Sequence, residues 1–299
     1  MAQRIEFDAF GGPEVLHLKD FDMPQPGDGQ VVVRNSAVGV NPYDWKFIAG
    51  KAGMPKRPFP LVPGNEGSGV VESVGAGVEG FVVGDEVIWR GYLDGYATHR
   101  LIAAASVYPK PANQSFSEAA GLPVAGGTAF AALEQLGVTA GDLVLVHAAA
   151  GGVGSAAVQI ALHLGARVIG TASTPNHEYL ESLGAIAVTY GPGLADRVRA
   201  IGDITASVDF VGSPESIAVT RELLGEAPRA VTAAHSDEAE AAGIHSVEKN
   251  PGSIPAAIEL AANGGLVTEV SREFSLADAG FALALSQNGH VRGKIVLLP

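Results

Sequence analysis

The stretch LVLVHAAAGGVGSAAVQIALHLGARVIGTAS, from Leu143 to Ser173, gives the clearest indication of the fold. It begins with a short apolar run, passes through a turn of alanines and glycines, and ends in a second apolar run. Apolar residues between the two runs recur at helical spacing: Val153, Ala157, Ile160, Ala161 and Leu164. The stretch therefore predicts a strand, a tight turn, a helix and a second strand, the order of a parallel βαβ unit.

The turn suits the pyrophosphate of a dinucleotide. Gly151 lets the backbone approach the phosphates, Gly154 lets the helix pack closely on the sheet, and the helix N-terminus offers N–H groups to an anion. Compared with the pattern G-x-G-x-x-G, the first glycine is replaced by Ala149. The alternative is a turn whose glycines serve only the backbone. We predict cofactor contacts from the turn residues Ala150, Gly151, Gly152, Val153 and Gly154.

The flanking sequence indicates two domains, as does the length of 299 residues at about 150 residues per domain. Up to residue 115, short valine-rich runs alternate with glycine and proline, which is typical of a compact β domain. Strand-like and helix-like segments then alternate, which indicates a parallel sheet with crossover helices. We predict strands at Leu143–Ala148, Arg167–Ala172, Ala185–Val188, Ser207–Val211, Arg229–Ala234 and Gly243–Val247, and a helix at Ile254–Ala262. The remaining tail is too short to stand alone, so we expect it to return to the first domain.

The composition argues against several classes of function. Lys and Arg number 19 against 32 Asp and Glu, a net charge of −13, and no basic run is dense enough to follow nucleic acid or an anionic membrane. The sequence shows no basic start with an apolar stretch and no apolar run of about 18 residues, so we expect a cytoplasmic protein without a membrane partner. There is no Cys, and the eight His lack paired ligand spacing, so we expect no metal.

Further motifs follow one another in a recognisable order: VGVNPYDWK at Val38–Lys46, PGNEGSGVVESVGAGVEGFVVGDEV at Pro63–Val87, AAGLPVAGGTAFAAL at Ala119–Leu133, VTAGDLVLVHAAAGGVG at Val138–Gly154 and RGKIVLLP at Arg292–Pro299. Together they resemble the medium-chain dehydrogenase/reductase superfamily, especially its zinc-free, zeta-crystallin-like quinone oxidoreductase branch. The resemblance covers essentially the whole chain. It implies an α/β protein with a GroES-like, β-rich catalytic domain at residues 1–115 and 256–299 and a Rossmann domain, a doubly wound parallel sheet, at residues 116–255.

The chain departs from the zinc-containing relatives at the metal ligands. In zinc alcohol dehydrogenases a Cys and a Gly-His-Glu supply such ligands, whereas this chain has no Cys and reads Gly64, Asn65, Glu66. Without a Lewis acid to hold an alkoxide, alcohol oxidation loses its usual driving element. Hydride transfer to an electron-poor carbon of a quinone, enone or enal needs no metal.

The resemblance also implies catalytic residues, in a cleft between the domains where the nicotinamide meets the substrate. Asn41 is expected beside the nicotinamide ribose, with Tyr43, Asp44 and Lys46 near the cleft. Either Tyr43 or Lys46 would donate the proton that completes a reduction, or polarise the acceptor's carbonyl oxygen. Many relatives carry a Tyr at the position of Lys46. The alternative for Tyr43 and Asp44 is a turn that caps local backbone.

Three further places are expected to touch the cofactor. Thr128, at the expected helix start GGTAF, matches a residue on the nicotinamide side in relatives, and the alternative is an ordinary N-cap. The backbone at Val211 and at Ala233 and Ala234 follows two later strands. By the switch-point rule for open sheets, these strand ends should line the cofactor groove.

The end of the second strand bears on cofactor choice. Rossmann units selective for NAD carry an Asp or Glu about 20 residues past the glycines, where this chain has Ser173 and Thr174. Hydroxyls can donate to a 2′-phosphate that a carboxylate would repel. Relatives place phosphate contacts at the positions of His177 and Tyr190. We therefore expect a preference for NADPH that strengthens as the pH falls and His177 is protonated. The alternative is that Ser173 and Thr174 only cap a helix starting near Pro175.

The sequence therefore predicts an NADPH-dependent reductase of quinones or activated alkenes. An enoyl-thioester reductase of a biosynthetic pathway is the alternative within that class. A protein that binds NADPH without turnover is the alternative outside it. Because relatives commonly dimerise through the exposed edge of the Rossmann sheet, we expect a homodimer formed along Gly243–Val247.

Overall fold

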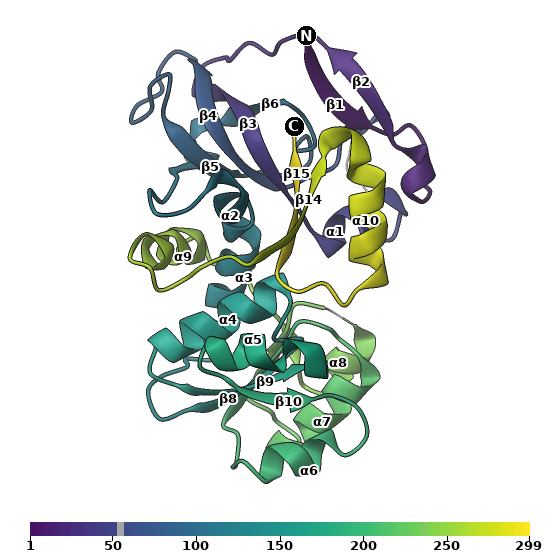
Figure 1. Ribbon diagram of the computed structural model, residues 1–299, viewed down its shortest axis with the longest axis vertical. Helices are drawn as coiled ribbons and strands as arrows, with labels where there is room; N and C mark the ends of the chain where they lie inside the picture. Colours follow the sequence, from purple (N-terminus) through teal and green to yellow (C-terminus); the bar gives the residue numbers. More distant parts are fainter. Residues whose placement is uncertain (53–56, 235) are drawn as a thin grey trace. The chain divides into compact units, whose positions relative to one another are not determined.

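The computed structural model describes residues 1–52, 57–234 and 236–299. The chain divides into two compact units, one formed by Met1–Val124 with Thr268–Pro299 and the other by Ala125–Val267 (Figure 1). The first unit is rich in strands, and the second alternates strands with helices. None of the helices in the described ranges is long and apolar enough to span a membrane.

The second unit is built on a parallel sheet with the strand order β10-β9-β8-β11-β12-β13. Its strands are β8 (Leu143–His147), β9 (Arg167–Ala172), β10 (Ile186–Thr189), β11 (Ala206–Asp209), β12 (Ala230–Thr232) and β13 (His245–Ser246). Counted along the chain, this order is 3-2-1-4-5-6, that of a doubly wound Rossmann sheet. Strands β9 and β10 are added on one side of β8, and β11, β12 and β13 on the other, so the switch point lies between the neighbouring parallel strands β8 and β11.

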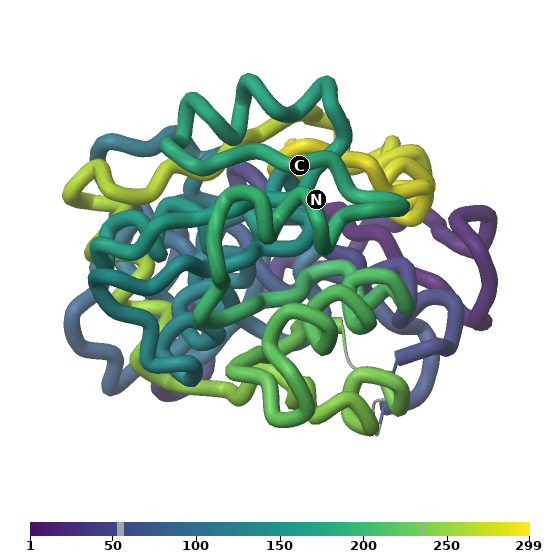
Figure 2. Tube along the Cα trace, turned by 90° about the horizontal axis from the view of Figure 1, so that it is seen from below, coloured from purple at the N-terminus to yellow at the C-terminus, as the bar shows by residue number. Residues whose placement is uncertain are grey.

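Helices connect these strands. They are α3 (Leu122–Gln135), α4 (Gly152–His163), α5 (His177–Ser182), α6 (Leu194–Arg199), α7 (Pro214–Leu224), α8 (Asp237–Ala241) and α9 (Ser253–Ala262). Figure 2 follows them along the Cα trace in teal and green. All residues of β8 are buried, as expected for a central parallel strand covered on both faces. A core cluster joins Leu143 and Leu145 of β8 to Leu194 and Val198 of α6 and to Val219 of α7.

A buried polar group lies where β8 and β11 meet α7. The ring Nε2 of His147 lies 3.2 Å from the Thr220 hydroxyl oxygen, which in turn lies 3.2 Å from the hydroxyl oxygen of Ser207. Burial lowers the pKa of His147 from 6.5 to about 4, although the negative charge of Asp209 acts in the opposite direction. The folded Rossmann unit therefore favours a neutral imidazole at this position.

The first unit is built on a mixed sheet with the order β14-β15-β3-β4-β5-β7, in which β6 also pairs with β3. The strands are β3 (Gln30–Val40), β4 (Glu66–Val74), β5 (Glu86–Arg90), β6 (His99–Ala103), β7 (Val107–Pro109), β14 (Val270–Ser275) and β15 (Lys294–Leu298), with β1 (Ala2–Glu6) and β2 (His17–Phe21) as a separate pair. Its helices are α1 (Pro42–Ile48), α2 (Phe116–Ala120) and α10 (Ala279–Asn288), with single 3-10 turns at Pro13–Val15, Ala104–Ser106 and Leu276–Asp278. Buried valines of β3 pack with Trp89, Phe7 and Phe47 in its core.

The tail returns to the first unit, as expected from the sequence. Strand β15 pairs antiparallel with β3, matching Ile295 to Val40 and Leu297 to Val38. This pairing places Lys294, at the start of β15, beside the end of β3. The last strand of the described chain therefore completes the sheet that begins near residue 30.

The α/β class and the doubly wound sheet are confirmed, and most strand ends agree with the prediction to within two residues. The two compact units divide the chain after Val124 and after Val267, whereas the sequence suggested domain boundaries at residues 115 and 255. Helix α9 belongs to the Rossmann unit because it packs on α3, where a Cβ at Gly127 would lie 2.7 Å from Ile254 Cγ1. The same packing shows that GGTAF is not a helix start. Thr128 lies inside α3, so neither a helix start nor an N-cap is correct for it.

Candidate functional site

The glycine-rich turn joins β8 to α4 as a tight, closely packed bend. Ala148 adopts a left-handed conformation at φ 55°, and its N–H donates to the Thr171 hydroxyl at 3.2 Å. A Cβ at position 154 would overlap the carbonyl oxygen of Ala148, so only glycine fits there. Gly151 occupies the N-cap position of α4. The predicted turn residues are therefore brought together at the switch point of the sheet.

The N-terminus of α4 has the properties of a pyrophosphate site. The first N–H groups of a helix lack intrahelical acceptors, and Gly151 has no side chain to cap them. The helix is 12 residues long, so its dipole favours an anion at this end. A Cβ at Gly151 would meet only the Ala148 carbonyl oxygen, at 3.4 Å. These residues fit the diphosphate of a nicotinamide dinucleotide.

The loops after β11 and β12 contact each other at Gly212 and Ala234. The buried carboxylate of Asp209 accepts hydrogen bonds from the N–H groups of Val211 and Gly212, at 2.8 and 3.0 Å. Gly212, at φ 65°, lies so close to the next loop that a Cβ there would be 2.6 Å from that of Ala234. Val211 is left 51% exposed. The structure thus brings Val211 and Ala233–Ala234 together.

The ends of β9 and β10 form a polar cluster. The Ser173 hydroxyl accepts a hydrogen bond from Asn176 at 3.1 Å, and the His177 Nε2 lies 3.3 Å from the Thr189 hydroxyl oxygen. Ser173 precedes a 3-10 turn, Thr174–Asn176, and its side chain does not cap that turn. The α-helix itself begins only at His177, so the pure capping interpretation of Ser173 does not hold.

An arginine holds the neighbouring loop. Arg197 of α6 donates to the carbonyl oxygen of Thr189 at 2.8 and 3.1 Å, to that of Gly191 at 2.9 Å and to that of Pro192 at 2.9 Å. Tyr190, 42% exposed, lies within this loop. Because carbonyl groups carry no net charge, Arg197 adds a positive charge beside the Thr189–His177 contact.

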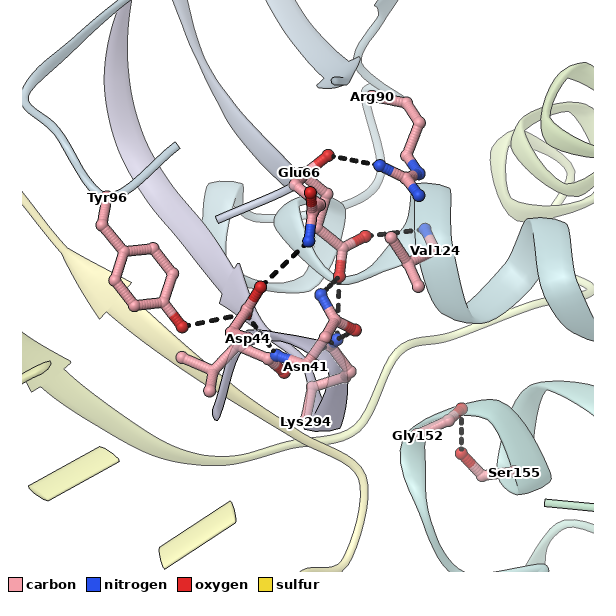
Figure 3. A network of polar contacts seen from close by, with 11 residues as sticks. Asn41, Asp44, Glu66, Arg90, Tyr96, Val124, Gly152, Ser155 and Lys294 are labelled. Atoms are coloured by element: carbon pink, nitrogen blue, oxygen red, sulfur yellow. Dashed lines mark hydrogen bonds and ion pairs between the residues drawn. The ribbon is translucent and has the colours of Figure 1, made fainter. Parts of the chain in front are cut away.

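In the catalytic unit, a buried polar network surrounds Asn41, which is the N-cap of α1 (Figure 3). Its side-chain amide donates to Glu66 at 2.9 Å and accepts from the Lys294 ammonium at 2.7 Å. Lys294 also forms an ion pair with Glu66 at 2.8 Å. The second Glu66 oxygen accepts the Val124 N–H at 2.7 Å. The Asn41 amide is thereby oriented by two opposite charges.

Asp44 is the second carboxylate of this network, and all its bonds are internal. It accepts the Asn41 N–H at 2.9 Å, the Tyr96 hydroxyl at 3.0 Å and the Asn65 amide at 3.0 Å. Burial raises its pKa from 3.8 to about 6, although the hydrogen bonds from Asn41 and Tyr96 and the positive charge of Lys294 oppose that shift in part. These contacts agree with the capping alternative for Asp44, which organises the turn rather than facing solvent.

Asn65, which the sequence resemblance matches to the metal-binding His of zinc alcohol dehydrogenases, forms hydrogen bonds through both its amide nitrogen and its amide oxygen. It donates to Asp44 and accepts the N–H of Leu93 at 3.1 Å. Its backbone carbonyl accepts from Arg90 at 2.9 Å and from the Gly91 N–H at 2.8 Å. Among the described residues, no three His, Asp or Glu side chains are placed to hold a metal ion.

Tyr43 and Lys46 both lie on α1 but in different surroundings. Tyr43 is half-buried, stacks on Phe47 with ring centroids 6.1 Å apart, and donates to the Tyr92 hydroxyl at 3.4 Å. Burial and this hydrogen bond raise its pKa. Lys46 is exposed, with its ammonium 5.6 Å from the centre of the Trp45 ring.

Each of the two units matches a known protein family. Residues 27–131 match the alcohol dehydrogenase GroES-like domain, and residues 152–247 match the zinc-binding dehydrogenase domain. The whole chain superposes on the quinone oxidoreductase of Coxiella burnetii with a TM-score of 0.87 and 32% identity, covering 99% of that structure. The chain belongs to the medium-chain dehydrogenase/reductase family. Within it, the chain is quinone oxidoreductase-like.

Curated relatives within the medium-chain family agree over shorter alignments. The chain is 41% identical over 177 residues to a Pseudomonas aeruginosa quinone oxidoreductase, across 58% of this chain and 54% of that protein. It is 39% identical over 194 residues to a Solanum lycopersicum 2-methylene-furan-3-one reductase, across 60% of this chain and 50% of that protein. The chain thus spans about half the length of the curated relatives it matches.

The sequence motifs of this medium-chain family member contained site residues whose roles were not predicted. Glu66 and Lys294 lie in two of the quoted motifs, PGNEGSG and RGKIVLLP, and they meet only in the folded unit. Tyr92 and Arg197 lie outside those motifs. An internal Glu within a glycine run and a Lys before a buried strand were the available signals, since neither residue type is readily buried without a partner.

Proposed function

We propose that this chain is an NADPH-dependent reductase that transfers a hydride to quinones or to activated alkenes such as enones and enals, without a metal. The observation that carries the proposal is the hydrogen bonding of Asn65, whose amide binds Asp44 and the Leu93 backbone. By resemblance, zinc-containing relatives have a metal-binding His at this position. A site without that Lewis acid suits acceptors that are already electron-poor. The names of the Pseudomonas and tomato relatives support this acceptor class.

The bound nicotinamide would supply the hydride. The chain's own residues bind and orient it: the α4 N-terminus with residues 150–154 would hold the pyrophosphate, and Val211 with Ala233–Ala234 would border it. Asn41, held by Glu66 and Lys294, is proposed to bind the nicotinamide ribose. Thr128 of the Rossmann unit is proposed as a further cofactor contact. Tyr43 and Lys46 remain the two candidates for the polar group that meets the acceptor oxygen.

The preference for NADPH rests on the β9 and β10 ends. Ser173 and Thr174 follow β9 where NAD-selective units carry a carboxylate, and His177, Tyr190 and Arg197 come from the neighbouring segments, with Arg197 adding a fixed positive charge. Each of these groups can donate to, or attract, a 2′-phosphate. We expect a higher kcat/KM for NADPH than for NADH with one good acceptor. Equal or better use of NADH would contradict the role given to Ser173.

The deciding experiment measures NADPH oxidation against quinones, enals, enones and enoyl thioesters. Turnover of quinones or enones supports the proposed reductase, whereas turnover confined to enoyl thioesters supports the biosynthetic alternative. Tight NADPH binding without any turnover would instead support a non-catalytic binding protein. Binding is measured separately by the change in NADPH fluorescence.

We further propose a cytoplasmic homodimer that pairs through β13. This strand ends the Rossmann sheet among the described strands, and an exposed edge is a natural pairing surface. Light scattering at micromolar concentration tests the assembly. A monomer at that concentration would overturn it.

A further inference from the structure

Residues 91–95 form a loop, here called the Tyr92 loop, that presents one exposed phenol. Tyr92 is 51% exposed, whereas the side chain of its neighbour Leu93 is only 1% exposed and packs in the core. The loop follows β5 directly. A large aromatic side chain is thus displayed on a loop whose next residue is anchored in the interior.

The backbone of the Tyr92 loop is held by hydrogen bonds on both sides of the phenol. The N–H of Gly91 donates to the Asn65 carbonyl, and that of Leu93 donates to the Asn65 side chain. The N–H groups of Asp94 and Gly95 donate to the carbonyl oxygens of Val62 and Pro63, each at 2.9 Å. These bonds hold the backbone on both sides of Tyr92 in place.

Ion pairs to Asp94 add to these backbone hydrogen bonds. Arg57 forms two parallel hydrogen bonds to the Asp94 carboxylate, at 2.7 and 2.9 Å. Arg100, which is largely buried and lies 5.7 Å from the centre of the Trp89 ring, approaches the same carboxylate at 3.6 Å. Bidentate arginine pairs fix orientation as well as distance.

The loop holds a conformation that its sequence does not favour. Leu93 and Asp94 are consecutive non-glycine residues with φ of 60° and 61°. Non-glycine residues in this conformation persist only where the surrounding structure holds them, most often at functional sites. The backbone hydrogen bonds of the loop and the Arg57–Asp94 ion pair supply that constraint.

The displayed phenol meets Tyr43, the residue already proposed for the acceptor oxygen. The Tyr43 hydroxyl donates to the Tyr92 oxygen at 3.4 Å, and both rings border Phe47. Since Tyr43 uses its hydrogen toward Tyr92, the hydroxyl hydrogen of Tyr92 is the one available to a ligand. Donation into a hydroxyl strengthens the bond that this hydroxyl itself donates.

We infer that the Tyr92 hydroxyl, backed by Tyr43, binds the carbonyl oxygen of the acceptor, at a position that Asn65 fixes through the Tyr92 loop. The inference rests on the proposed function. Asn65 would thus have exchanged the metal ligation of the zinc relatives for the positioning of a hydrogen-bond donor. The class of ligand is a conjugated carbonyl compound, such as a quinone or enone.

The chemistry balances without a further reactant. As the hydride adds to the acceptor carbon, the π electron pair moves to oxygen, and the resulting oxyanion is held by the Tyr92 hydroxyl. A proton from water completes the reduction. The raised pKa of Tyr43 favours a phenol that keeps its proton and donates hydrogen bonds. The phenol pair acts as a small oxyanion hole.

Kinetic variants provide the first test. Tyr92→Phe should lower kcat with a quinone by about 10-fold to 100-fold, because one oxyanion donor is lost, while the Kd for NADPH stays the same. Tyr43→Phe should have a smaller effect in the same direction. Tyr108→Phe, which removes a phenol from β7, is the matched control and should leave kcat unchanged. An unchanged kcat in Tyr92→Phe would overturn the inference.

A second test needs no turnover and so separates this inference from the proposed function. 4-Nitrophenolate serves as the probe of the oxyanion, since a hydrogen bond to its oxygen shifts its absorption to shorter wavelength. The wild type should bind it with that shift, and Tyr92→Phe should lose the shift. If the wild type reduces no acceptor yet shows the Tyr92-dependent shift, the reductase proposal fails and the oxygen site stands. Binding without a Tyr92-dependent shift overturns the oxygen site.

Discussion

The glycine-rich turn after β8 and the buried network around Asn41 are both polar sites, but they are assembled in opposite ways. The turn uses consecutive residues, Ala148 to Gly154, and backbone groups. The network joins side chains from the N-cap and first turn of α1, from β4 and from β15, with Asn41 and Lys294 lying 253 positions apart in the sequence. The first tolerates change poorly for steric reasons, and the second because its charges lie out of water.

The largest effect expected in this comparison comes from breaking the network's ion pair. Lys294→Met leaves Glu66, which is 0% exposed, as an uncompensated buried charge, so the free energy of unfolding should fall by about 3–5 kcal/mol. Denaturant unfolding measures it. Adding Glu66→Gln should recover part of the loss by removing that charge.

A matched control for this variant is Lys110→Met. Lys110 is also buried, but its partner Glu86 is 55% exposed and is rehydrated when the lysine is lost. We expect less than half the effect of Lys294→Met. Equal losses would show that burial of the partner charge is not what makes the network sensitive.

Acid should act on the two units with opposite signs. In the Rossmann unit, the pKa of His147 is lowered from 6.5 to about 4, so its neutral form stabilises the fold and about 3 kcal/mol is lost as the pH falls from 6.5 to 4. In the network, the pKa of Asp44 is raised from 3.8 to about 6, so stability is gained as the pH falls from 6 to 3.8.

His147→Gln tests the Rossmann side of this balance. Its free energy of unfolding, measured by urea between pH 6.5 and 4, should fall less than that of the wild type. The exposed His163 of α4 provides the control, since His163→Gln should keep the wild-type slope. Parallel slopes for the wild type and His147→Gln would place the acid sensitivity elsewhere.

The choice between NADPH and NADH is tested at Ser173, which follows β9. Ser173→Asp supplies the carboxylate that NAD-selective units carry, so the ratio of kcat/KM for NADPH to that for NADH should fall about 10-fold, or about 1.4 kcal/mol. Ser182→Asp adds the same charge to α5, where the serine hydroxyl bonds only its own helix at the Tyr179 carbonyl. That variant should leave the ratio near the wild-type value.

The smallest expected effect is that of metal removal. Because the Asn65 amide is committed to Asp44 and Leu93, extensive dialysis against a chelator should leave the rate of NADPH oxidation unchanged. A rate that falls and returns with added Zn²⁺ would contradict the metal-free proposal. A parallel sample dialysed against buffer alone controls for loss during handling.

The same contrast explains which parts could be predicted from the sequence. Strand β9 agrees with the prediction at both ends, because apolar runs and glycines are local signals. The helix start predicted at Thr128 is wrong because α3 already begins at Leu122. Gly127 instead allows close packing against Ile254 of α9, a helix far away in the sequence. Glu66 and Lys294 could be quoted as motif residues, yet their pairing depends on the antiparallel register of β15 on β3.

The Tyr92 loop shows the same limit more sharply. Asp94 and Gly95 form a local turn signal, but a left-handed Leu93 has none, because a leucine rarely adopts a positive φ. Its conformation depends on the contacts that Asn65, Arg57 and Val62 make with the loop. The sequence comparison identified position 65 only by the metal-binding histidine that it lacks. The amide that replaces it has a positive role that only its partners reveal.

The late pairing of β15 also bears on the order in which the chain becomes native during synthesis. The strands of the Rossmann unit emerge from the ribosome in succession, between residues 143 and 246, and can assemble among themselves. Most strands of the sheet in the first unit emerge earlier, but this sheet is complete only when residues 294–298 pair with β3 and Lys294 forms its ion pair with Glu66. The sheet whose strands are synthesised first is therefore completed last. A nascent chain stalled before residue 294 should contain a native Rossmann unit and an incomplete sheet with an unpaired edge, to which chaperones bind.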